Sequence, residues 1–370
     1  MRTPLFIRWT GLLLAGATVF VLILLGRTSR APAATSVRAA REVVAPQVEA
    51  YIERLDSLSV QLRPGLLRRA ENGDLYSFAV NPNELWKISP TGQKTQFNLA
   101  AIPEVRQSQI FHFVQDFAFD SSENLYVPAI WRLQNGKIRS THFGIFSFNS
   151  EGNLQRKIEL TPAMEIRRLA IDDAGNFFVV GIDAGYFQGQ KKSCYLLHKY
   201  SPSGALLKQM SECPPTSNPL LINNRLNPSG FDELKLDIDV DQVWVDGERV
   251  VHVLPKSHLV RVFDTKSGAG AEASLDVPPV APTGARARIA EIMPLADGKY
   301  LVVWQFSVFA GNTVSGSAYL TVHQSDGTLA SKPWALVDEV PVFSDKLGNV
   351  YLAGKSNDGV RITRAQLSLR

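Results

Sequence analysis

The segment L-A-I-D-D-A-G-N-F-F-V-V, residues 169 to 180, joins two apolar runs through a turn rich in Asp, Gly and Asn. Val and Phe favour strands, whereas Asp, Asn and Gly tolerate the left-handed backbone of a tight hairpin. The segment therefore predicts a β-hairpin. The same pattern of apolar run, polar turn and apolar run begins again at Arg68, Phe117, Val243, Met293 and Val342.

These turns recur at a nearly constant interval along the chain. Their markers are Gly73, Glu123 in the unit without glycine, Gly175, Gly247, Gly298 and Gly348. A second class of turn alternates with the first, at Gly92, Gly152, Gly204, Gly268 and Gly327. Each unit therefore holds two hairpins, or four strands. Six such units predict an all-β fold, a six-bladed β-propeller of four-stranded blades over residues 57–370.

The segment ahead of the first unit can supply the strand that the last unit lacks. The last unit reaches Arg370 after three strands, and Ser57 to Leu62 alternates polar and apolar residues ahead of the first unit. We therefore expect Ser57 to Leu62 to add the outermost strand of the last blade. Just upstream, Pro46 to Leu58 carries apolar residues at helical spacing, which predicts a short amphipathic helix in a linker of residues 31–56.

The best-matched units, Leu169 to Val180 and Val342 to Leu352, resemble those of NHL-repeat and TolB-like six-bladed propellers. In these families a strand, an Asp-Gly-Asn turn and a Tyr-Val-type strand recur in each blade. The resemblance covers about residues 60 to 370 and implies the same fold. It implies no particular activity, because propellers serve as enzymes, receptors and scaffolds alike.

Residues 1–30 predict an apolar helix that acts as a membrane anchor or a signal. The run from Trp9 to Gly26 is uncharged, and it is longer than the ~7 to 15 residues of a typical secretory signal core. We expect a single membrane span with an exported domain, periplasmic or extracellular. The alternative is a secreted protein cleaved near Ala33.

Charge gives no reason to expect nucleic acid as a partner. Four of the 39 basic residues lie in residues 1–30, so the remaining 35 balance the 35 acidic residues of the chain. A surface for phosphate backbones would need a local excess of Lys and Arg, and no run of these residues exceeds two.

Both classes of turn lie on one face of the predicted propeller and are short. The other connections are long, among them Ile130 to Thr141 and Ser307 to Gly316, and they gather on the opposite face. Long loops on a rigid scaffold commonly bind ligands, so we expect a protein or a small molecule to bind on this loop-rich face. The candidate contact residues are Trp131, Arg132, Tyr186, His252 and His258.

A cluster of carboxylates predicts a site for one divalent cation such as Ca²⁺. Spacing of two places Asp239 and Asp241 on one face of a strand, and Asp116 and Glu291 occupy comparable positions in other blades. The alternative is a solvated strand face. Six-bladed lactonases of the gluconolactonase type hold a divalent metal at the channel mouth, so this resemblance implies a metal-dependent hydrolase as the alternative function. The chain departs from that family at Leu66 to Arg68, where those enzymes carry a Glu. The sequence identifies no catalytic residue.

The two cysteines predict a disulfide. Cys194 and Cys213 fall on adjacent antiparallel strands joined by the turn at Ser201 to Gly204, within one residue of opposite each other. A bridge would agree with an oxidising compartment and therefore with export. The alternative is two unrelated thiols, because a slip of one residue would send the side chains to opposite faces.

Overall fold

A computed structural model gives the fold of most of the chain. It describes residues 48–60, 66–70, 73–80, 83–99, 102–108, 110–114, 116–135, 138–183, 195–212, 241–280, 285–310, 313–336, 338–345, 347–356 and 359–370. The predicted anchor and both cysteines lie outside the described residues, as do Tyr186 and Asp239. In the described part, no helix is both long and apolar enough to span a membrane.

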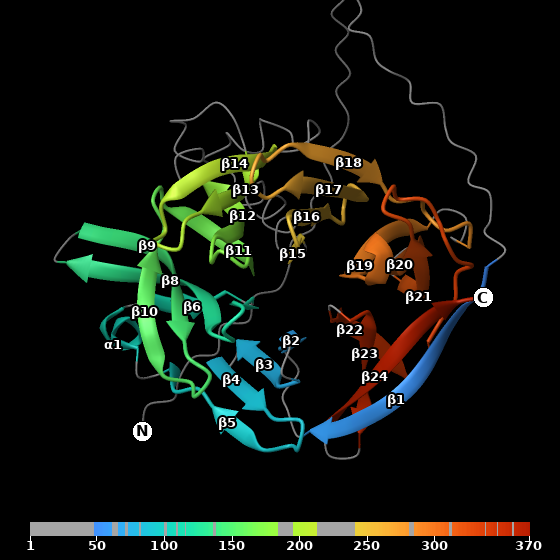
Figure 1. Cartoon of the computed structure of the whole chain (residues 1–370), viewed down its shortest axis with the longest axis horizontal. Coiled ribbons are helices and arrows are strands. Elements are labelled where there is room, and N and C mark those ends of the chain that lie inside the picture. The colour runs from blue at the N-terminus through green and yellow to red at the C-terminus, as the bar shows by residue number, and fades with distance from the viewer. Residues whose placement is uncertain are drawn as a thin grey trace, which may run out of the picture. The chain divides into compact units, whose positions relative to one another are not determined.

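The described strands form six sheets arranged as the blades of a ring, which confirms the six-bladed propeller (Figure 1). Blade 1 contains β2 (Leu66–Arg69), β3 (Leu75–Val80), β4 (Asn83–Ile88) and β5 (Lys94–Gln96). Blade 3 contains β11 (Met164–Ile171), β12 (Phe177–Asp183), β13 (Tyr195–Tyr200) and β14 (Leu206–Glu212), and blade 4 contains β15 (Gln242–Asp246), β16 (Arg249–Leu254), β17 (Leu259–Asp264) and β18 (Gly270–Ser274). The first strand of each blade is the innermost.

Blades 2 and 5 vary this plan. In blade 2 the innermost strand is split into β6 (Ile110–Phe113), which follows helix α1 (Pro103–Gln107), and β7 (Ala118–Phe119); β8 (Leu125–Asn135), β9 (Ile138–Phe148) and β10 (Leu154–Glu159) complete it. Blade 5 has β19 (Arg286–Pro294), the 3₁₀ turn η2 (Ala296–Gly298), β20 (Tyr300–Ala310) and β21 (Thr313–His323). Its fourth position is taken by an irregular segment, bridged at Leu320 to Trp334 and at His323 to Leu329.

Blade 6 closes the ring as expected. It contains β22 (Glu339–Ser344), β23 (Asn349–Ser356) and β24 (Gly359–Leu369), and β1 (Ala50–Val60) pairs with β24 along its whole length. The predicted linker helix is wrong, since those residues form β1. A bulge between Arg54 and Asp56 switches the faces of the strand, so Ile52 packs between blades 5 and 6 while Leu58 packs between blades 6 and 1. This switch produces apolar spacing that imitates a helix.

The first-hairpin turns lie on one face of the ring, which we call the short-turn face. Side chains within each turn stabilise it by hydrogen bonds. In blade 2, Asp120 accepts bonds from the backbone N–H of Asn124 at 2.9 Å and from the Tyr126 hydroxyl at 2.9 Å. Asp345 does the same in blade 6, with Asn349 at 2.9 Å and Tyr351 at 3.0 Å. Each carboxylate thereby satisfies several donors within one turn.

Blade 1 breaks this pattern and provides a test of it. Ala70 stands where the turns of blades 2, 3 and 6 have Asp, and the hydroxyl of buried Tyr76 has no hydrogen-bond partner among the described residues. We expect Tyr126→Phe and Tyr351→Phe each to cost about 1 kcal/mol of unfolding free energy, because a bonded hydroxyl is lost. Tyr76→Phe should be neutral or slightly stabilising. Denaturant melts of the three variants measure this, and an equal loss in all three would contradict the assignment.

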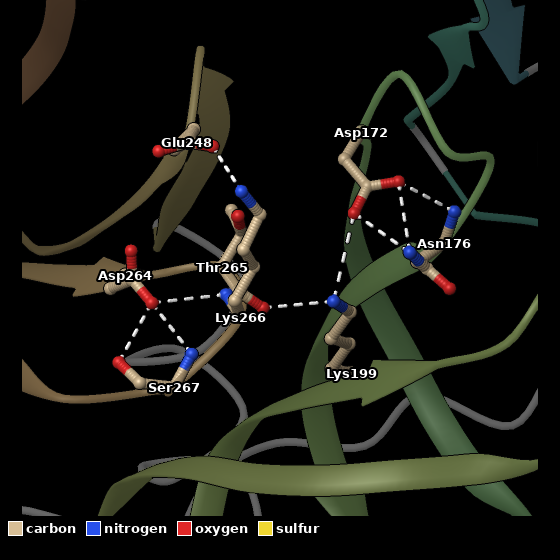
Figure 2. A network of polar contacts seen from close by, with 8 residues as sticks. All are labelled: Asp172, Asn176, Lys199, Glu248, Asp264, Thr265, Lys266 and Ser267. Carbon is tan, nitrogen blue, oxygen red and sulfur yellow. Dashed lines mark hydrogen bonds and ion pairs between the residues drawn. The ribbon is translucent and has the colours of Figure 1, made fainter.

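Lysines connect the same turns from blade to blade. Figure 2 shows Lys199 of β13 donating to the carbonyl of Thr265 in blade 4 at 2.8 Å, with its Nζ 3.7 Å from Asp172 Oδ2. Lys87 of blade 1 repeats this arrangement, at 3.0 Å from both Asp74 Oδ2 and the Ser150 carbonyl of blade 2. The turns of the short-turn face are therefore held both within and between blades.

The opposite face carries long hairpins where two of the loops were expected. Ile130 to Thr141 and Ser307 to Gly316 lie mostly in strands: β8 and β9, and likewise β20 and β21, are paired strands of 11 residues that are two residues apart in the sequence. The equivalent strands of blade 4 have 6 residues, so each hairpin is longer by about 15 Å. Figure 1 shows the β8–β9 hairpin projecting outward from the ring. Alternating polar and apolar residues in these segments pair across the hairpin.

Candidate ligand site at the ring axis

Polar side chains from the inner strands of five blades form a cluster, which we call the axis cluster. Its members are Arg68 of blade 1, Asp116 of blade 2, Arg168 of blade 3, Gln242 of blade 4 and Glu291 of blade 5. The charges of Arg68 and Arg168 both act on Glu291, although their blades do not adjoin blade 5. Inner strands of non-adjacent blades approach one another only around the ring axis, which locates the cluster there.

Asp116 joins three blades. It is buried, with 1% of its surface exposed, and its Oδ1 accepts a bond from Nη2 of Arg68 at 2.5 Å. Its Oδ2 accepts the backbone N–H of Leu169 at 2.6 Å. Arg68 also donates to the carbonyl of Phe117. The carboxylate is thus fully engaged in holding blades 1, 2 and 3 together.

Gln242 has the corresponding role between blades 4 and 5. Its Nε2 donates to Oε1 of Glu291 at 2.5 Å, and its Oε1 accepts the backbone N–H of Ile292 at 3.3 Å. Burial raises the pKa of Glu291 to about 7, while the bond from Gln242 and the charges of Arg168 and Arg68 limit the rise. Glu291 therefore changes its charge near neutral pH, under the electrostatic influence of two guanidinium groups.

Asp241 and His252 lie in a separate, buried chain of hydrogen bonds between blades 3 and 4. The guanidinium of Arg261 donates to Oγ of Ser211 at 2.8 Å, and Ser211 Oγ lies 2.9 Å from Nδ1 of His252. Nε2 of His252 lies 3.1 Å from Oδ2 of Asp241. Because Arg261 can only donate, the chain is satisfied when Ser211 donates to Nδ1 and Nε2–H donates to Asp241. His252 is fully buried in β16 and so is not the exposed contact residue that we expected.

The remaining described candidates are spread over the ring. Trp131 was expected in a binding loop but is a buried residue of β8, with its ring stacked on His142 at 5.5 Å between centroids. Arg132, the next residue of β8, is half-buried. His258 lies in the β16–β17 turn, where its Nε2 is 3.3 Å from the Ala287 carbonyl. Burial lowers the pKa of His258, and that hydrogen bond only partly opposes the effect.

The described carboxylates do not converge on one cation. Asp116 is bound by Arg68 and Leu169, and Asp241 by His252, and no group of three His, Cys, Asp or Glu residues suited to a metal occurs within the described ranges. Asp239 lies outside those ranges, so the complete four-residue set stays a prediction. The disulfide and the contact at Tyr186 also stay predictions for this reason.

The sequence analysis assigned no role to Gln242 or Arg168. It missed the Ser211 contact altogether, because Ser211 is on an outer strand and meets His252 only through the packing of two blades. The sequence analysis noted that the chain departs from the lactonases at Leu66 to Arg68. This departure was the sequence feature that could have indicated the axis cluster.

The fold and the site together define a six-bladed β-propeller with a charged cluster at its axis. No protein-family model and no curated protein matches the sequence. Among solved structures, the chain is similar to virginiamycin B lyase from Staphylococcus aureus, with 10% identity over 86% of this chain and 99% of the other and a TM-score of 0.43. It is also similar to the calcium-binding protein regucalcin from Agrobacterium tumefaciens, with 12% identity over 82% and 90% and a TM-score of 0.45. A third is the PQQ-bound aldose sugar dehydrogenase from Streptomyces coelicolor, with 14% identity over 88% and 100% and a TM-score of 0.43.

Proposed function

We propose that this protein is a ligand-binding β-propeller that acts outside the cytoplasm and binds its partner on the face opposite the short-turn face. The difference between the two faces carries the proposal. Turns on one face are fixed by Asp, Tyr and Lys side chains, as at Asp120 and Lys199. The other face bears the long β8–β9 and β20–β21 hairpins, and elements that project from a rigid scaffold commonly contact ligands.

The position of β1 agrees with this assignment. Ala50 pairs with Leu369 at the end of β24, and β24 starts on the long-hairpin face, where Gly359 pairs with Ser356 of β23. β1 therefore begins on the short-turn face. The chain therefore enters this strand on the face opposite the long hairpins, and we propose that residues 1–30 serve as a membrane anchor.

Binding is favoured over the metal-dependent hydrolase by the contacts of the carboxylates. Asp116 and Asp241 both hold blades together, through Arg68, Leu169 and His252. A carboxylate already bonded to protein donors would have to give up those bonds to ligate a cation. Membership of the NHL or TolB-like group would be compatible with either function.

Cross-linking from the two ends of one strand tests the proposed face. A photoreactive amino acid is placed at Thr141, exposed on β9, and as a matched control at Glu151, exposed in the β9–β10 turn. In intact cells we expect a discrete adduct from position 141 and none from position 151. Equal labelling at both positions, or no adduct at position 141, would contradict a binding face at the long hairpins. Protease treatment of cells with intact and with opened membranes checks export.

A further inference from the structure

The third strand of blade 5 has an edge that is only partly covered. β21 is the outermost strand of its three-stranded sheet (Figure 1). The irregular segment that follows it bonds to the backbone of Leu320 and Val322. From Thr313 to Tyr319, β21 pairs with β20 on one side and with none of the described residues on the other. We call residues 313–319 the open edge.

Backbone groups of alternate residues point outward from the open edge. The N–H and C=O of Leu320 bond to Trp334, on the side away from β20, at 2.7 and 3.0 Å. Because successive residues of a strand direct their backbone groups to opposite sides, Val314, Gly316 and Ala318 direct theirs the same way as Leu320. Each of these residues therefore offers one N–H and one C=O to a further strand.

The open edge lacks the features that keep edge strands from pairing. Proteins protect such edges with charged residues, Pro or bulges. Each outermost strand of the other five blades carries a charged residue, at Glu53, Lys94, Arg156, Lys208 and Glu272. The open edge reads T-V-S-G-S-A-Y, without charge or Pro, and its pairing with β20 has no bulge. It is therefore suited to pair with another strand.

The composition of the open edge is complementary to itself. Two identical strands that pair antiparallel are related by a two-fold axis. Only the register centred on Gly316 lets all of the outward-facing residues bond to their counterparts. In that register Val314 of one copy lies opposite Ala318 of the other, so a larger residue meets a small one on both sides of the axis. No like charges meet across the pair, because the open edge has none.

The length of the open edge fits the same pairing. Thr313, the last paired residue at the hairpin tip, then lies opposite Tyr319 of the other copy. Directly after Tyr319 the edge is already occupied, since Leu320 bonds to Trp334. The pairing thus uses the open edge from end to end. It also keeps the two rings apart, because each β21 packs into its own ring at Leu320, and these ends point in opposite directions.

We propose that two copies of this protein associate through the open edge, with β21 of each copy paired antiparallel to β21 of the other around Gly316. The pairing exchanges about six main-chain hydrogen bonds, two at each pair of outward-facing residues. It joins two three-stranded sheets into one continuous sheet. A second copy is the occupant that both the register and the length of the edge fit. This association goes beyond the binding function proposed above and does not depend on it.

Cross-linking tests the pairing and its register. The full chain carries a photoreactive amino acid at Ala318, which is exposed, and two differently tagged forms are co-expressed and purified in detergent micelles. We expect an adduct that contains both tags, with the link in the peptide that contains Val314. The same amino acid at Ala271, exposed on β18 of blade 4, is the control and should give no such adduct. The proposal is overturned if position 318 gives no adduct with both tags, or if position 271 gives an equal yield.

Two variants of Ala318 test whether the edge drives association. Ala318→Pro removes an outward N–H and leaves the bonds to β20 intact, so the dissociation constant of the dimer should rise at least about tenfold. Sedimentation of the full chain in micelles at several concentrations measures it. If Ala318→Pro does not fold, Ala318→Lys puts a charge on the same edge and should have the same effect, with Ala271→Lys as its matched control. Association that is unchanged in a folded Ala318 variant overturns the proposal, because it then comes from another part of the chain.

Discussion

Deletion of residues 1–60 should lower the melting temperature by at least ~10 °C or prevent folding, whereas deletion of residues 1–47 should leave it unchanged. Both truncations remove the segment before β1, but only the longer one removes β1 and its pairing with β24. Ile52 and Leu58 are partly buried in the two cores that flank blade 6, and the loss of each costs about 1 kcal/mol, a fraction of the value for a fully buried side chain. Thermal melts of the two purified domains measure the difference, and equal melting temperatures would contradict closure of the ring by β1.

An ion pair between β1 and β22 allows a second test of the role of β1, with a smaller expected effect. Nη2 of Arg54 on β1 lies 2.7 Å from Oε2 of Glu339 on β22, and the Glu339 side chain is only 3% exposed. Gly354 makes this possible, since a Cβ there would lie 3.1 Å from Cγ of Glu339. Arg54→Ala should therefore destabilise the domain, while Leu55→Ala, at the exposed bulge, should not.

The pH dependence of that pair has a defined sign. Burial would raise the pKa of Glu339, but the bonds from Arg54 and Thr363 and the charge of Arg361 bring it below the usual value of 4.5. A lowered pKa in the folded state means that the stabilisation is present above about pH 4.5 and is lost as the pH falls through the folded-state pKa. Acid titration of the melting temperature should show this loss in the unmodified domain, and a smaller loss in Arg54→Ala.

The blades were predictable because each turn is encoded locally. Asp120 and Asn124, or Asp345 and Asn349, satisfy the donors of a turn within five residues, so the motif is visible in the sequence without knowledge of the fold. Regular spacing of such turns then determines the number of blades. The pairing of β1 with β24 was also predictable, because the last unit is one strand short.

The axis cluster and the buried chain depend on contacts that the sequence does not display. Asp116 meets Leu169, 53 residues away, only because adjacent blades pack at a fixed angle. An acidic residue at an inner-strand position is equally consistent with a cation ligand and with a partner for an arginine. Trp131 was misassigned because the loop was expected to begin at Ile130, whereas β8 continues through it to Asn135.

Replacement of Asp241 by Ala should cost about 1 to 3 kcal/mol of unfolding free energy, which is the usual penalty for leaving a buried hydrogen-bond donor without its acceptor. The carboxylate is 3% exposed and accepts from His252, which in turn contacts Ser211 of the neighbouring blade. His252→Ala should be similarly damaging because it leaves Asp241 buried without its imidazole. The double variant should lose less than the sum of the two single losses, since both remove the same interaction.

The matched control is Asp246→Ala, which removes an exposed ion pair with Arg249 and should change stability by no more than ~0.5 kcal/mol. Melts in calcium and in chelator distinguish the two roles considered for Asp241, which are a link between blades 3 and 4 and a metal ligand. If it only links blades 3 and 4, the loss in Asp241→Ala is the same in calcium and in chelator, because no bound cation contributes to stability. A loss that appears only in calcium would instead assign Asp241 to a metal site and contradict the hydrogen-bonded chain as its main role. Urea melts of the four variants in both buffers make that comparison, and the His252→Ala variant shows whether any calcium effect depends on the imidazole.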